Sequence, residues 1–239
     1  MKTIAIIQAR MGSTRLPGKV LKPLAGDTVL GHVVRRVRAA QRLDGVCVAT
    51  TEAVAEGPIV AECARLGVGC FRGSEPDVLA RYFGAAQARG AEIIVRVTSD
   101  CPFFDGALLD EMLARFHATP GLDYLSNVQE RRFPRGLDAE VFTFAALARA
   151  HREATQPHER EHVTPYFYQH PERFRLHSFV GTEDWSAHRW TLDTPVDWQF
   201  VEAVYAALGA NFTTADVLNL LKARPELARL NAHVEQKPL

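Results

Sequence analysis

The chain has 239 residues, of which 47% are hydrophobic and 23% charged, and its 28 Lys and Arg residues balance 28 Asp and Glu residues. This is the composition of a globular protein, and it excludes disordered and fibrous classes. Zero net charge argues against broad binding to nucleic acid or anionic membranes, but it allows a local basic site for a small anion. No apolar run is long enough to cross a bilayer, so we expect neither a nucleic-acid nor a membrane partner.

Four cysteines are present, and none forms a C-x-x-C pair: Cys47, Cys63, Cys70 and Cys101. Disulfides are rare in reducing compartments, and these cysteines lie in apolar or mixed segments. The apolar stretch before Gln8 is too short for a signal peptide. We therefore expect a reduced, cytoplasmic protein.

The first half of the chain alternates predicted strands and helices. Apolar, β-branched segments predict strands over residues 3–9, 45–50, 68–71 and 92–97. Apolar periodicity predicts helices over 28–41 (with Asp27 as N-cap), over 53–66, and after Ser74–Asp77. Such alternation predicts an α/β fold, with a mostly parallel sheet covered by helices on both faces.

The second half changes character after residue 127, where Arg, His, Pro and aromatic residues become more frequent. We expect an inserted arm over about 129–190 that binds the acceptor or pairs two subunits, within a single domain over 1–239. Trp190–Asp193 predicts a strand that returns to the main sheet, and helices are expected over 195–208 and 214–223.

The loop after the first predicted strand is rich in glycine and cations. Arg10, Arg15 and Lys19 share ten residues with Gly12 and Gly18. Glycines let backbone amides close on an anion, cations neutralise it, and such loops bind nucleotides at strand carboxyl ends. The loop is no P-loop, because five residues instead of four separate its glycines and no Ser or Thr follows the lysine. The alternative is a surface loop with solvated charges.

Two carboxylates follow strand-like runs. Asp100 ends the run Arg96–Ser99, and Asp193 ends Arg189–Leu192. Carboxylates at the carboxyl edge of a sheet can hold Mg²⁺ together with phosphate oxygens and water. The alternatives are a turn at Asp100 and a helix cap at Asp193, although Thr194 could take the capping role.

Near these residues, Asp197 is expected to complement the dipole of the following helix as a first-turn charge. A separate motif, His158–His162, reads H-E-R-E-H, which matches the zinc-hydrolase pattern. Pro157 and Pro165 confine it to a short, charged helix, and no third ligand stands out. A zinc hydrolase is therefore an alternative with little support.

Six segments together resemble one family: Ile7–Leu21, Gly73–Tyr82, Arg96–Phe103, Phe133–Phe142, Glu159–Tyr166 and Arg189–Asp197. They are similar to the cytidylyltransferases that activate acylneuraminate and 3-deoxy-octulosonate sugars as CMP-sugars, and most of all to the SpsF-like branch of spore coat polysaccharide biosynthesis. The resemblance covers nearly the whole chain. It implies a Rossmann-like (GT-A-like) three-layer nucleotidyltransferase fold, CTP, Mg²⁺ and a homodimer.

The resemblance also implies roles for individual residues. The catalytic residues would be Arg10, Arg15, Lys19 and Asp100, with Mg²⁺ on Asp100 and Asp193. Nucleotide contacts would come from Gln8, Ala9, Arg10, Gly12, Ser13, Arg15, Lys19, Gly73, Asp77, Arg81 and Ser99. Acceptor contacts would come from Arg135, Asp138, Glu140, Arg160 and His162. A plain helix N-terminus around Asp77 and a polar hairpin around Arg135 are the alternatives.

The expected function is transfer of CMP from CTP to a small acidic sugar of the keto-acid type, with release of pyrophosphate, for the biosynthesis of a polysaccharide or glycan. The other readings are a nucleotidyltransferase with another nucleotide or acceptor, and a nucleotide-binding protein without activity.

Overall fold

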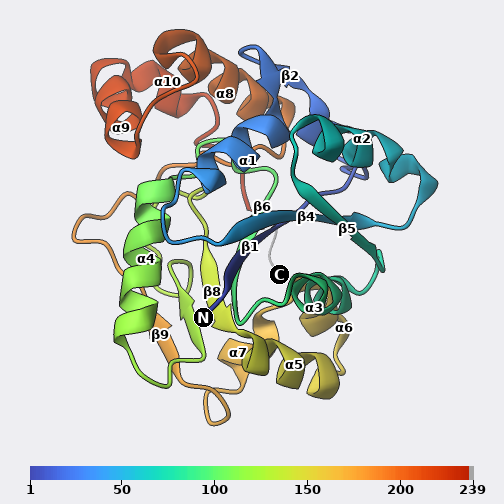
Figure 1. The fold of residues 1–239 in the computed structure, drawn as a ribbon. Helices are drawn as coiled ribbons and strands as arrows, with labels where there is room; N and C mark the ends of the chain where they lie inside the picture. Colours follow the sequence, from blue (N-terminus) through green and yellow to red (C-terminus); the bar gives the residue numbers. More distant parts are fainter. Residues whose placement is uncertain (237–239) are drawn as a thin grey trace.

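Seven strands form the central sheet of the computed structural model, which describes residues 1–236 (Figure 1). Their order across the sheet is β5-β4-β1-β6-β8-β7-β9. The strands span Thr3–Gln8 (β1), Gly45–Thr51 (β4), Gly69–Gly73 (β5), Ile93–Thr98 (β6), Tyr124–Ser126 (β7), Glu140–Thr143 (β8) and Leu176–Ser178 (β9). Only β8 runs antiparallel to its neighbours, so the predicted α/β class with a mostly parallel sheet is confirmed.

Helices cover both faces of this sheet (Figure 1). One apolar core lies under α1 (Val29–Arg38), α2 (Gly57–Arg65) and α4 (Gly106–Ala118). A second core on the opposite face lies under α3 (Val78–Arg89), α5 (Phe144–Glu153) and α7 (Pro165–Gln169). The short elements are η1 (Lys19–Leu21), η2 (Val54–Glu56), α6 (Pro157–His162) and the ribbon β2 (Pro23–Leu24) with β3 (Asp27–Thr28).

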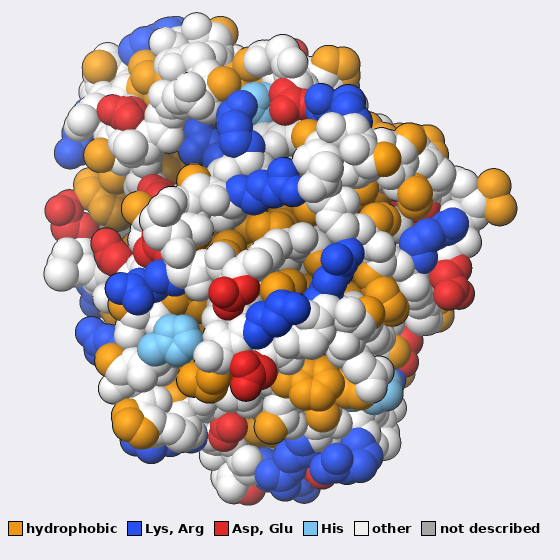
Figure 2. Space-filling model, in the orientation of Figure 1, with side chains coloured by type: hydrophobic (Ala, Val, Ile, Leu, Met, Phe, Trp, Pro, Cys, Tyr) orange, Lys and Arg blue, Asp and Glu red, His pale blue; other side chains and the backbone are white. Residues whose placement is uncertain are grey.

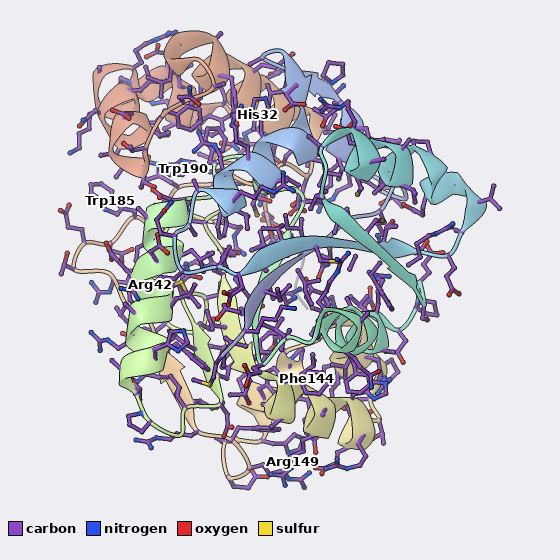
Figure 3. All side chains as sticks on the ribbon, viewed as in Figure 1. His32, Arg42, Phe144, Arg149, Trp185 and Trp190 are labelled. Atoms are coloured by element: carbon purple, nitrogen blue, oxygen red, sulfur yellow. The ribbon has the colours of Figure 1, made fainter. Side chains whose placement is uncertain are left out.

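A third core joins the C-terminal helices to the sheet. It lies among α8 (Pro195–Leu208), α9 (Thr214–Ala223) and α10 (Pro225–Arg229), and it includes Phe103 and Trp190. Figure 3 places Trp190 where these helices meet the sheet layer. Both helices predicted for this part of the chain are confirmed with their predicted bounds.

The predicted N-cap of the first helix is wrong by one residue. Thr28 caps α1, because its hydroxyl accepts a hydrogen bond from Gly31 N, and Asp27 instead belongs to β3. The helix is also shorter than predicted and ends at Arg38. Its buried stripe of Leu30, Val33, Val34 and Val37 is the face that the periodicity identified.

The strand predicted over Trp190–Asp193 does not form. Trp190 N donates to Arg135 O (2.6 Å) and Leu192 N donates to Asp100 O (2.8 Å). The segment therefore crosses the carboxyl ends of the strands instead of joining the ladder. Its apolar residues are buried under α8 rather than in the sheet, which explains why the pattern resembled a strand.

The arm expected over about 129–190 is not a separate lobe. Residues in this range supply β8 and β9 to the central sheet, and β8 lies between β6 and β7. Val141 and Phe142 are buried on opposite faces of the sheet, so this segment belongs to both cores. The loops on either side of β8 and β9 lie together outside the sheet, where Trp185 N donates to Arg132 O (2.7 Å).

Within residues 1–236, no helix is long and apolar enough to span a membrane. The four cysteines carry free thiols. On the face drawn in Figure 2, cationic and acidic side chains both occur across the surface, and several cationic side chains lie together at its lower edge.

Candidate active site

Three charged side chains from distant parts of the chain meet at the carboxyl edge of the sheet. The Lys19 ammonium lies 2.9 Å from Asp100 Oδ2 and 2.9 Å from Asp193 Oδ1. Its third hydrogen bond goes to Leu192 O (2.7 Å). Lys19 follows Gly18, whose φ of 65° is left-handed and suits glycine. Asp100 follows β6, and Asp193 precedes α8, so three elements deliver these groups to one point.

The second oxygen of each carboxylate is anchored by other residues. Asp100 Oδ1 accepts from Thr98 Oγ1 (2.6 Å). Asp193 Oδ2 accepts from Arg189 Nη2 (3.0 Å) and lies 3.4 Å from Arg15 Nη2. Thr194, not Asp193, caps α8, since its side chain accepts from Asp197 N. The alternative of a helix cap at Asp193 is thereby excluded.

Electrostatics favour the charged forms of Lys19 and Asp100. Burial alone would raise the pKa of Asp100, but the Lys19 ammonium outweighs it and lowers that pKa to about 2. Burial alone would lower the pKa of Lys19, and the two carboxylates raise it instead. The side chains are 11% (Lys19), 24% (Asp100) and 12% (Asp193) exposed, so solvent screens their attraction weakly.

Two carboxylate oxygens directed at one cation form the kind of donor set that a hard divalent ion takes with phosphate oxygens and water. Residues 1–236 contain no cluster of three or more His, Cys, Asp and Glu side chains that would hold a metal by itself. The pair therefore fits Mg²⁺ that shares its shell with a phosphate, and it does not fit an all-protein metal cage.

The first loop, residues 10–19, is held at its start by the buried carboxylate of Glu56, which was not predicted from the sequence. Glu56 is 3% exposed and accepts from Met11 N (3.1 Å) and from Thr50 Oγ1 (2.9 Å). Ser13 N and Gly18 N both donate to Met11 O, which closes the loop on itself. The only sequence signal was an acidic residue beside the start of a predicted helix, which is ordinary.

The remaining loop residues differ in their surroundings. Ala9 N continues the sheet by donating to Ala49 O (3.1 Å). Ser13 Oγ accepts from Leu16 N (3.3 Å). Arg10 and Gly12 are exposed, and a side chain at Gly12 would meet open space. No packing contact explains this glycine, and a ligand that approaches the backbone would.

Two buried polar atoms without partners belong to side chains of β1 and α3. They are Gln8 Oε1 and Arg81 Nε. Arg81 Nη1 donates to Ser74 O (2.7 Å), and its stem packs against Gly73. Ser99, also buried, joins β6 to β1 through its backbone N–H to Gln8 O (3.1 Å). A ligand with complementary groups would satisfy the two orphaned atoms.

Asp77 and Arg160 are engaged with each other. Asp77 Oδ1 caps α3 by accepting from Ala80 N (2.8 Å), and its Oδ2 accepts from Arg160 Nε (3.0 Å). Arg160 also donates to His151 O (2.7 Å). Neither side chain lines the cleft described next. Asp77, which was predicted to contact the nucleotide, and Arg160, which was predicted to contact the acceptor, therefore share a structural role. One oxygen of the Asp77 carboxylate caps α3, and the other binds the Arg160 guanidinium.

A cleft of about 680 Å³ opens beside the carboxylates. Four arginines from separate segments line it: Arg15, Arg96, Arg131 and Arg135. Its other lining residues include Thr98, Asp100, Gln129, Asp138, Glu140, Glu161, His162, Tyr168 and Asp193. A second hollow of about 700 Å³ over β7 and β9 shares Gln129 and Tyr168 with it.

Among the four arginines of this cleft, Arg135 is the one whose side chain has no partner within residues 1–236; the acidic Glu161, which is exposed, also has none. Arg131 binds Asp138 in a bidentate pair (2.6 and 3.1 Å). Glu140 forms an ion pair with Arg96 and accepts from Tyr124 Oη (2.5 Å). The half-buried Arg135 guanidinium is therefore available to an anionic ligand.

A glycine turn places Arg135. Gly136 has φ of 109°, and a Cβ there would lie 2.6 Å from the Trp190 carbonyl carbon, so only glycine fits. Arg96 was missed by sequence reasoning, although a charged residue inside the apolar strand β6 was a visible signal. Arg131 and Tyr168 carried no such signal.

The H-E-R-E-H motif does not converge on one point. His158 is exposed and bonds Gln169 (2.9 Å), whereas His162 lines the cleft. Glu159 is buried and accepts from Thr155 N (3.0 Å) and Gln156 N (2.9 Å) in the capping box of α6. The glutamate that a zinc hydrolase would use as its base is thus committed to the helix start.

Comparison with known proteins agrees with this geometry. The sequence model described as cytidylyltransferase matches residues 4–208. The chain is 35% identical to the spore coat polysaccharide biosynthesis protein SpsF of Bacillus subtilis, over 93% of this chain and 95% of that protein.

Solved structures give the same result. A cytidylyltransferase from Leptospira borgpetersenii superposes with a TM-score of 0.92 at 34% identity, covering 100% of this chain and 99% of that one. A CMP:2-keto-3-deoxy-manno-octonic acid synthetase complexed with CTP superposes with a TM-score of 0.67 at 18% identity, over 87% and 99% of the two chains. At that identity the second likeness concerns the fold.

Proposed function

Because this chain belongs to the cytidylyltransferase family, we propose that it transfers CMP from CTP to a small acidic sugar in a Mg²⁺-dependent reaction that releases pyrophosphate. The convergence of Lys19, Asp100 and Asp193 beside an arginine-lined cleft carries the proposal. The likeness to a polysaccharide biosynthesis protein suggests that the product serves the synthesis of a surface polysaccharide or glycan.

The nucleotide would lie along the first loop. Arg10, Arg15 and Lys19 supply the positive charge that a triphosphate requires, and backbone amides near Gly12 can approach it because the space there is open. Mg²⁺ held by Asp100 and Asp193 would supply charge neutralisation at the phosphate oxygens.

The two orphaned atoms favour a cytosine base. Gln8 Oε1 is a buried acceptor and requires a donor such as the exocyclic amino group of cytosine. Arg81 Nε is a buried donor and suits the ring carbonyl. Uracil presents a carbonyl where cytosine presents the amino group, so a Gln8 oxygen held toward the base would favour CTP over UTP.

The acceptor would enter through the cleft. Arg135 offers a free guanidinium fork for a sugar carboxylate, and Arg96, paired with Glu140, also lines the cleft. The acceptor hydroxyl would attack the α-phosphorus and give up its proton to water in the cleft, and the new O–P bond would form as the bond to the leaving pyrophosphate breaks. The chain's part is to position both substrates and stabilise charge, and no protein nucleophile is required.

A pyrophosphate-release assay tests this function directly. It combines the four nucleoside triphosphates with a panel of eight- and nine-carbon keto-acid sugars, with and without Mg²⁺. We expect release with CTP, an acidic acceptor and Mg²⁺ together. Release with another nucleotide or with neutral sugars alone would replace the proposed substrates, and nucleotide binding without release for any acceptor would favour a binding protein.

We also propose that the protein forms a homodimer, as the family resemblance implies. The strand β9 lies at one edge of the sheet, and its outer side pairs with no strand of residues 1–236. Sedimentation equilibrium should give twice the chain mass of 26.5 kDa, and a monomer at micromolar concentration would contradict the proposal.

A further inference from the structure

Lys19 stands where the proposed metal would bind. All three hydrogen bonds that an ammonium can donate are made, to Asp100 Oδ2, Asp193 Oδ1 and Leu192 O, at 2.7–2.9 Å. A side chain that was only waiting for phosphate would point its ammonium into the cleft. Here the whole Lys19 side chain is only 11% exposed, and its ammonium is bound by the carboxylate pair, Asp100 and Asp193.

The carboxylate pair is arranged so that its free oxygens depend on this one cation. The other oxygens are anchored by Thr98 on Asp100 and by Arg189 on Asp193. In the part of the chain that the structure describes, Asp100 Oδ2 and Asp193 Oδ1 have no hydrogen-bond partner except Lys19. These two oxygens are the ones that would bind a metal, so Lys19 and the metal compete for the same atoms.

Charge determines the order in which the nucleotide and the metal bind. Two carboxylates with one ammonium carry one net negative charge, and Arg15 and Arg189 lie against the same pair. A divalent ion that joined them while Lys19 stayed would meet a positive neighbour at contact distance, which is unfavourable. A triphosphate removes the conflict, because its oxygens offer the flexible lysine another partner in the adjoining cleft.

We propose that Lys19 occupies the metal position in the nucleotide-free protein and transfers to the triphosphate when the nucleotide arrives, so that divalent-cation binding depends on nucleotide binding. This inference rests on the proposed function for the identity of the metal site. Binding of the two ligands is then coupled, and each increases the affinity for the other.

The experiment measures Mn²⁺ binding to the full-length protein without nucleotide, by the loss of the free-ion signal in electron paramagnetic resonance. We expect Lys19→Ala to bind one Mn²⁺ on the order of tenfold or more tightly than the wild type, because two facing carboxylates are left without a cation. Lys19→Met, which keeps the apolar stem, should show the same gain. Adding Asp193→Asn to either variant should abolish the gain.

Lys22→Ala is the matched control. Lys22 lies in the same loop region, over the Trp198 ring (4.5 Å to its centroid), and forms no ion pair with either carboxylate. This variant should bind Mn²⁺ like the wild type. An equal gain in Lys22→Ala would reduce the effect to net charge and overturn the inference, as would unchanged affinity in both Lys19 variants when circular dichroism shows them folded.

The failure of this inference and that of the proposed function can be distinguished. If the wild type binds Mn²⁺ without nucleotide as tightly as Lys19→Ala, yet releases pyrophosphate from CTP, the lysine has no competing role and the function stands. If Asp193→Asn leaves Mn²⁺ binding and turnover unchanged, the proposed metal site itself is wrong.

Discussion

Two clusters of charged residues meet at Arg189 and Asp193, and they differ in how completely their atoms are satisfied. In the buried cluster of Arg189, Asp197 and Asn231, Asp197 is 0% exposed and accepts from Arg189, Asn231, Thr194 and Asp193 N. In the carboxylate pair, each residue keeps one oxygen that only Lys19 binds within the described chain.

This difference separates residues that stabilise the fold from residues that can bind a ligand. A saturated carboxylate has no lone pair left for a ligand, and its contacts orient Asp193 and the start of α8. A carboxylate oxygen that is bound only by one exchangeable cation can lose that cation and bind a metal ion in its place. The same residue type thus serves the scaffold at Asp197 and the proposed reaction at Asp100, and each prediction below tests one side of this division.

The largest effect on stability is expected at Asp197. Asp197→Ala removes one partner of a buried ion pair and leaves Arg189 partly uncompensated, so the free energy of unfolding should fall by about 3–5 kcal/mol. Urea denaturation followed by circular dichroism measures it. Asp216→Ala is the matched control, since Asp216 makes the same capping box with Thr213 on α9, but at an exposed position. Equal losses in the two variants would remove the distinction.

Asp100→Ala tests the carboxylate pair. This variant is expected to leave the protein folded while turnover falls by about 10²–10³, because a group that stabilises charge in the transition state is lost. Steady-state pyrophosphate release at saturating CTP, acceptor and Mg²⁺ measures turnover. Wild-type turnover in this variant would show that the carboxylate pair has no part in the reaction.

The carboxylate pair was easier to identify from the sequence than the buried cluster of Arg189, Asp197 and Asn231. Asp100 and Asp193 were found because each follows an apolar run that ends at the carboxyl edge of a sheet. Asp197 was predicted to be a first-turn charge of the following helix, which is confirmed, but its burial was not predicted, because that depends on Arg189 and on Asn231, 34 residues away. A pattern read along the chain shows which end of an element a residue occupies, but not which distant side chain meets it.

The fold shows the same limit. The parallel half and the last helices were predicted well, because their apolar periods are regular. Trp190–Asp193 was predicted to be a strand, although its apolar residues pack under helices. Glu56 and Arg96 were missed because their roles come from long-range partners. Lys19 was predicted to bind the triphosphate. Its partners in the absence of a ligand lie far away in the chain and could not be derived from the sequence of its loop.

A smaller effect is expected from the unpartnered arginine of the cleft. Arg135→Gln should raise KM for the acidic acceptor by about tenfold, which corresponds to one charge-assisted contact, and should change kcat little. KM for CTP should stay the same. Arg131→Gln is the comparison, because Arg131 is already bound to Asp138. If Arg131→Gln raises KM for the acceptor more than Arg135→Gln does, the free guanidinium is not the binding group.

The smallest effect is a difference in acid stability between the two clusters. The pKa of Asp100 is about 2 in the folded protein and ordinarily 3.8. Between these values the unfolded chain takes up a proton that the folded chain does not, so the free energy of unfolding falls as the pH falls. Asp100→Asn cannot titrate there, and its stability should decline less steeply than that of the wild type from about pH 4 to pH 2.

Asp197 also has a lowered pKa, because Arg189 and Asn231 outweigh the effect of its burial. It remains in Asp100→Asn, so that variant keeps this share of the acid sensitivity, and the difference between the two curves isolates the carboxylate pair. Urea denaturation at half-unit pH steps measures the difference. Parallel curves would mean that Lys19 does not hold Asp100 in its charged form in the folded protein.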